Sequence, residues 1–134
     1  LCMQKKIQRL EENLIILQNI YAQHNLEKIK TDTAVQWSIR YGIMESVQIV
    51  IDISCALCSK NNLGSPKSYA DCIKKLSQFS YLNQNTASTL VKLAGLRNIL
   101  VHEYVEIDIE KMYENLSDLG IFKQFISEIY KYLP

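Results

Sequence analysis

The chain has 134 residues, of which 48% are hydrophobic and 22% are charged, and its net charge is +1. These values fit one soluble globular domain over residues 1–134, long enough to bury a core. The small net charge excludes a strong overall positive field, so any contact with nucleic acid would depend on a local patch or on a dimer that doubles it. Only four glycines and two prolines occur, which favours long helices over a fold of many short strands.

Features that report on cellular location are sparse. We find no secretory signal and no apolar run long enough to span a bilayer, so we expect a cytoplasmic protein without a membrane segment. The sequence begins with Leu1, and we expect an initiator methionine or a short leader before it. In the cytosol we expect the four cysteines to be reduced thiols rather than a disulfide framework: Cys2, Cys55, Cys58 and Cys72.

The first half of the chain predicts two long helices. Apolar residues spaced three and four apart indicate an amphipathic helix over residues 3–24. The polar stretch 25–32 is interpreted as a connection. Thr33 and Gln36 match a capping box that would begin a second helix, which spans about 33–60.

The next two predicted helices are shorter. A break at 61–66 is followed by Ser68 and Asp71, which match a second capping box. They predict a helix over about 67–78, and a fourth helix is predicted over about 84–102.

The end of the chain predicts one more helix. Residues 105–107 are β-like but too few for a sheet, so we expect an extended link. Asp108 can cap a helix over about 109–133, which Gly120 interrupts. Within the second helix, Gly42 costs roughly 1 kcal/mol relative to alanine, so we expect another helix to approach closely there. Five helices with short links predict an all-α, antiparallel up-and-down bundle.

Several polar residues carry no predicted function. Cys55 and Cys58 have metal-ligand spacing, but no second pair or nearby histidine completes a zinc site, so we interpret them as small core residues. His24 is interpreted as a solvated residue at the end of the first helix. Glu45 and Asp52 share a face of the second helix, which we interpret as solvated and leave outside the site.

One cluster at the end of the fourth predicted helix could carry chemistry. Asn98 and His102 are four residues apart and would share a helix face. Histidine can exchange a proton with a ribose 2′-hydroxyl or a leaving oxygen, and the fork of Arg97 can hold a phosphate. Tyr104 follows, and Gly95 would let another backbone or a ligand approach. A purely structural alternative has Arg97 and His102 capping the last carbonyls.

The wider string resembles a known family. Arg97-Asn98-x-x-x-His102-x-Tyr104 is similar to the R-x4-H-x-Y motif of the HEPN superfamily, in its HepT-like toxin branch. The run continues through Ile107 and follows an all-α layout like that of the branch.

This resemblance implies an HEPN-like helical bundle that acts as the toxin of a toxin–antitoxin pair. It implies a ribonuclease that cuts RNA, either transfer or messenger RNA, with neither a metal nor another cofactor. Arg97 and His102 would be catalytic and Asn98 would support them. The chain would form a homodimer in which two motifs face a shared cleft.

The resemblance also implies a partner, a minimal nucleotidyltransferase antitoxin, in a complex that can be larger than the dimer. The antitoxin can transfer AMP to Tyr104, which would add bulk and negative charge beside Arg97. The alternative is a non-catalytic binding subunit of that nucleotidyltransferase, whose motif only binds nucleotide or phosphate.

Overall fold

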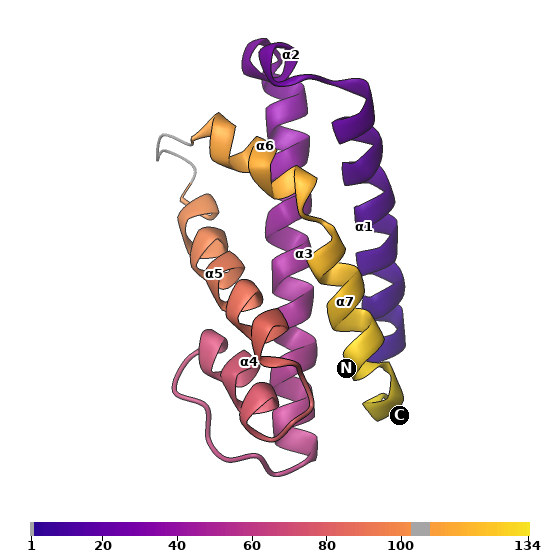
Figure 1. The fold of residues 1–134 in the computed structure, drawn as a ribbon, viewed down its shortest axis with the longest axis vertical. Coiled ribbons are helices and arrows are strands. Elements are labelled where there is room, and N and C mark those ends of the chain that lie inside the picture. Colours follow the sequence, from indigo (N-terminus) through magenta and orange to yellow (C-terminus); the bar gives the residue numbers. More distant parts are fainter. Residues whose placement is uncertain (1, 103–107) are drawn as a thin grey trace.

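The computed structural model describes residues 2–102 and 108–134, which form seven α-helices, a 3-10 helix and no strand. The long helices run alternately up and down the bundle (Figure 1), which confirms the predicted all-α antiparallel fold. There are more helices than the five predicted: α1 (Met3–Gln23), α2 (Leu26–Thr31), α3 (Thr33–Lys60), α4 (Tyr69–Gln78), α5 (Gln84–Leu100), α6 (Ile109–Ser117), α7 (Gly120–Ile129) and η1 (Tyr130–Tyr132).

Helix α3 is the axis of the bundle, and α1, α4, α5, α6 and α7 surround it (Figure 1). By length and composition alone α3 could cross a membrane, which the sequence analysis did not anticipate. However, more than half of its apolar stretch is buried against the other helices. A helix packed on several sides must be apolar around much of its circumference, so burial in the bundle accounts for its composition.

Helix α2 replaces the connection predicted for residues 25–32. The side chain of Asn25 accepts a hydrogen bond from Lys28 N at 2.9 Å, which caps the helix. Ile29 is fully buried, and Lys30 pairs with Glu110 of α6 at 3.2 Å. One apolar contact and one ion pair therefore fix a turn of helix that is too short to show a periodic pattern.

The capping box predicted from Thr33 and Gln36 is wrong. Asp32 precedes α3, and its Oδ1 accepts from Val35 N at 3.1 Å. Gln36 Nε2 instead donates to the carbonyl of Ile29 at 2.8 Å. Gln36 therefore closes the end of α2, and the carboxylate of Asp32 does the capping that a threonine hydroxyl was expected to do.

Two other predicted caps and one predicted interruption are present. Ser68 Oγ accepts from Asp71 N at 3.1 Å. Lys67 N donates to Asp71 Oδ2 at 2.9 Å, whereas in a regular capping box the donor would be the backbone N–H of Ser68. Asp108 caps α6 as predicted. The interruption predicted at Gly120 is also present, since α6 ends at residue 117 and α7 begins at 120.

Helices α1 and α3 approach closely at Gly42. A Cβ atom there would lie 2.8 Å from Leu17 Cδ2, inside van der Waals contact. Leu17 is almost completely buried, so its side chain has little room to move away. The predicted close helix contact at Gly42 is confirmed.

Ion pairs also join α1 to α3. Arg9 Nε lies 2.6 Å from Glu45 Oε1, which also accepts from Asn13 Nδ2 at 3.0 Å. Lys6 Nζ lies 2.8 Å from Asp52 Oδ2. Glu45 and Asp52 therefore hold two helices together, and the prediction that they form a solvated face is wrong.

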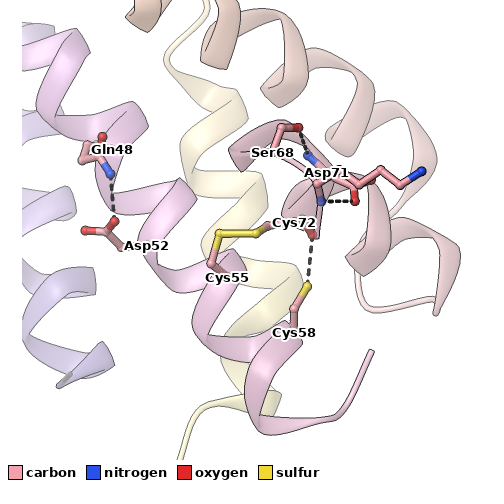
Figure 2. Close-up of a disulfide and its surroundings, with 8 residues drawn as sticks. Gln48, Asp52, Cys55, Cys58, Ser68, Asp71 and Cys72 are labelled. Atoms are coloured by element: carbon pink, nitrogen blue, oxygen red, sulfur yellow. Dashed lines mark hydrogen bonds between the residues drawn. A yellow bond between two sulfur atoms is a disulfide. The ribbon is translucent and has the colours of Figure 1, made fainter. Parts of the chain in front are cut away.

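A disulfide joins the far end of α3 to α4. Cys55 and Cys72 are bonded, with their Cα atoms 5.0 Å apart (Figure 2). The expectation of four reduced thiols is therefore wrong for this pair, because α4 folds back against the last turns of α3 and brings the two side chains together. Cys58 is buried, as predicted, and its Sγ donates to the carbonyl of Cys72 at 3.3 Å.

The two ends of the chain meet at one end of the bundle (Figure 1). Gln4 Nε2 donates to the carbonyl of Pro134 at 3.2 Å. The last residues of α5 lie toward the opposite end, on the side where α6 begins (Figure 1).

Reduction of the disulfide should lower the free energy of unfolding by about 3 kcal/mol, because the bond closes a loop across a separation of 17 residues. Urea unfolding with and without dithiothreitol measures this, and Cys72→Ser should abolish the effect of the reductant. Cys2→Ser is the control, since Cys2 is an exposed free thiol. Four titratable thiols in the unreduced, unfolded protein would contradict the bond.

Acid should weaken the contact between α1 and α3. Hydrogen bonds from Arg9, Tyr41 and Asn13 lower the pKa of Glu45 from its usual 4.5 to about 2, against the opposing effect of burial. The stabilisation is therefore complete above about pH 4.5 and is lost as the pH falls toward 2. Since Arg9 is more than half exposed, screening reduces it to about 1–2 kcal/mol.

Glu45→Gln should remove that part of the acid dependence, which urea unfolding at a series of pH values would reveal. Glu114→Gln is the matched control, because Glu114 is an exposed carboxylate of α6. Equal acid dependence in the Glu45 and Glu114 variants would contradict the assignment.

Candidate functional site

The motif lies across the end of α5, which is earlier than predicted. The helix ends at Leu100 rather than near residue 102. Val101 N still donates to the carbonyl of Arg97, four residues back, whereas His102 N donates to that of Ile99, three residues back, each at 3.2 Å. His102 therefore lies two residues beyond the helix. We expected Asn98 and His102 to share a helix face, but His102 lies outside the helix and does not continue the face of Asn98.

Arg40 of α3 closes the end of α5. Its Nε and Nη2 both donate to the carbonyl of Leu100, at 2.9 and 2.8 Å. A cation at the C-terminus of a helix satisfies an unpaired carbonyl and offsets the negative end of the helix dipole. No local sequence pattern predicts this contact, because 60 residues separate Arg40 from Leu100.

Arg97 keeps much of its hydrogen-bonding capacity. Its Nη1 donates to Asn98 Oδ1 at 3.3 Å, whereas its Nε is buried without a hydrogen-bond partner among the described residues. The structural alternative assigned Arg97 to capping the last carbonyls of α5. Arg40 instead donates to the carbonyl of Leu100. A buried N–H without a partner costs roughly 1–3 kcal/mol, so a purely structural arginine would be expected to pair it.

Asn98 and His102 are exposed beside Arg97. The fork of Arg97 and the imidazole of His102 thus come from the last turn of α5 and the residues just after it. Tyr104 and the predicted link at 105–107 lie outside the described residues. No described residue lies within 4 Å of a Cβ placed at Gly95, so the helix surface two residues before Arg97 is open in this part of the structure.

Metal-ligating side chains do not gather in the part of the chain that the structure describes. No group of three or more His, Cys, Asp or Glu residues is placed there to hold a metal ion. Cys55 is engaged in the disulfide and Cys58 in a hydrogen bond to the backbone.

Comparison with known proteins assigns the family. A family model described as ribonuclease HepT-like matches residues 10–129, nearly the whole chain. The chain belongs to the HepT-like family. The resemblance to this family is therefore confirmed, and the match covers all seven α-helices except the first residues of α1, and stops before η1.

Relatives of this HepT-like chain include characterised toxins. The mRNA nuclease HepT of Shewanella oneidensis is 29% identical over 125 residues, which are 92% of each chain. The solved structure of a tri-AMPylated HEPN toxin of S. oneidensis with its MNT antitoxin has 27% identity and a TM-score of 0.89 over 97% of each chain. A toxin–antitoxin structure with AMP-PNP has 27% identity and a TM-score of 0.91, covering 97% and 98%.

Proposed function

We propose that this chain is a metal-independent endoribonuclease toxin that acts in the cytosol, with Arg97 and His102 as its catalytic pair. The observation that carries the proposal is the guanidinium of Arg97 at the end of α5, whose Nε has no hydrogen-bond partner among the described residues, while Arg40 caps that helix end. Membership of a family of ribonucleases and a relative that is an mRNA nuclease support it.

The reaction we propose uses the 2′-hydroxyl of RNA as the nucleophile. His102 accepts the proton of that hydroxyl while its oxygen attacks the adjacent phosphorus, and the bond from phosphorus to the 5′-oxygen breaks. A proton delivered to the departing 5′-oxygen completes the step. The products are a 2′,3′-cyclic phosphate and a free 5′-hydroxyl, so the cleavage consumes no water and no oxidant.

Arg97 would act on the phosphate during this step. Negative charge gathers on the non-bridging oxygens in the transition state, and a guanidinium can donate two parallel hydrogen bonds to them. Asn98 accepts from Arg97 Nη1, so it would orient the fork. This role for Asn98 matches the supporting position that the family resemblance implies.

We further propose that a minimal nucleotidyltransferase antitoxin controls the chain. The S. oneidensis relative is AMPylated and bound to an MNT antitoxin. By the same chemistry, the Tyr104 hydroxyl would attack the α-phosphorus of ATP, forming AMP-tyrosine and releasing pyrophosphate. The added phosphate would repel RNA and occupy Arg97.

A homodimer would bring two motifs to one cleft and double the positive charge there. The surface of α5 beside the motif suits such a contact. Ile99 is 52% exposed although it is apolar, and the open position at Gly95 would let a partner backbone approach closely. We propose this face of α5 as the contact between the two copies.

Cleavage should depend on His102 and survive removal of metal. Wild type is incubated with messenger and transfer RNA in EDTA, and products are resolved on gels over time. His102→Ala should lose at least about 100-fold in rate, since a general acid–base typically contributes 10²–10⁴-fold. Arg97→Ala should lose a similar factor through lost transition-state stabilisation.

Two results would separate the rival explanations. Cleavage that stops in EDTA and returns with Mg²⁺ would refute a metal-independent mechanism. Tight binding of the nucleotidyltransferase without RNA turnover by unmodified wild type would favour the non-catalytic binding subunit. Intact mass must show that Tyr104 carries no AMP before inactivity is interpreted.

A bulky side chain at position 95 should separate the dimer. Gly95→Leu should shift the protein toward monomer in sedimentation equilibrium without destabilising it, because the position is open in the single chain and leucine is the better helix former. Gly95→Ala is the conservative comparison and should raise stability by up to about 1 kcal/mol. Unchanged dimerisation in Gly95→Leu would place the contact elsewhere.

A further inference from the structure

A groove adjoins the candidate site on the side of α3. It has a volume of about 550 Å³ and lies between the first half of α3 and the end of α5. Its floor includes Leu100 and Val101, the two residues that precede His102. The groove therefore borders the segment that carries the motif, and its described lining residues are Trp37, Arg40, Tyr41, Met44, Leu100 and Val101.

Two aromatic side chains that line this groove are exposed to solvent. Trp37 is 67% exposed and Tyr41 is 56% exposed, and as residues four apart on α3 they share a helix face. Tyr41 is also held in place, because a hydrogen bond to Glu45 raises the pKa of its hydroxyl. Large aromatic side chains this exposed and this close together indicate a surface that meets a ligand or a partner.

The charge in the groove favours an anion. Two nitrogens of Arg40 are fixed on the carbonyl of Leu100, which leaves Nη1 without a hydrogen bond among the described residues. Among the residues that the structure describes, none that lines the groove is acidic. The nearest carboxylate on the same helix face, Glu45, is offset by Arg9 at 2.6 Å.

We propose that this groove is a nucleotide subsite, in which Trp37 and Tyr41 stack on unpaired bases of RNA and Arg40 Nη1 contacts the phosphate. The proposal rests on the proposed ribonuclease function and names its substrate class, single-stranded RNA. Bases in a duplex stack on each other and do not offer their faces, whereas unpaired bases stack readily on aromatic side chains. Strand bound here would lead directly past Val101 to His102.

Trp37 gives a direct readout, since it is the only tryptophan of the chain. Wild type is titrated with a single-stranded RNA whose 2′-hydroxyls are methylated, so that it binds but cannot be cleaved through them. Quenching of tryptophan emission that saturates with binding is expected, and a blunt duplex of the same sequence should quench far less. Unchanged emission at concentrations where anisotropy shows the strand bound would overturn the subsite.

Variants test whether the rings contribute to binding. Trp37→Ala and Tyr41→Ala should each raise the Kd for the labelled strand by roughly 10-fold, the effect expected of one lost stacking contact. Tyr41→Phe should bind like wild type, because the ring remains. Tyr130→Ala is the matched control, since Tyr130 is 64% exposed on η1 and does not line the groove.

The outcomes separate this proposal from the function on which it rests. RNA cleavage with the same KM in wild type and Trp37→Ala would overturn the subsite and leave the ribonuclease intact. Loss of dimerisation in Trp37→Ala with unchanged Kd for RNA would also overturn it, because a second copy would then cover the ring. Wild type that neither binds nor cleaves RNA would overturn the ribonuclease itself.

Discussion

The burial of α3 is the constraint on which the rest of the molecule depends. Because other helices pack on several of its sides, α3 can reach both ends of the bundle with its own side chains. Near its start, Arg40 holds the end of α5, and near its finish Cys55 is bonded to α4. In between, Gly42 and Glu45 fix α1 at short range. The position of the motif is thus a property of the central helix as much as of the segment that carries it.

The way α5 ends also determines what its charged residues are free to do. A helix terminus leaves carbonyls that need donors, and the nearest cation usually supplies them. Here Arg40 supplies two donors from a different helix, so Arg97 is not consumed by its own helix end. Arg40 caps the helix, and Arg97 does not. Arg97 therefore keeps donors that the described end of its own helix does not use.

The sequence predicted the fold well because apolar periodicity and capping side chains act locally. Long helices, the cap at Asp108 and the interruption at Gly120 all depend on neighbours within one or two turns. Features that join distant residues were missed or misread, including the disulfide and the role of Glu45. The motif residues were singled out by their side-chain chemistry and by family resemblance, whereas Arg40 has no local pattern that could have revealed it. Pairings across the bundle depend on packing, which the sequence does not display.

The meeting of the chain ends has a practical consequence for work with this protein. Gln4 and Pro134 are hydrogen bonded at the end of the bundle away from the last turn of α5 (Figure 1). A fluorescent protein joined next to either residue would therefore begin at the opposite end of the bundle from the last turn of α5. The same adjacency would allow a short linker to join residues 4 and 134 and the chain to be opened elsewhere, because the join would span only a short distance.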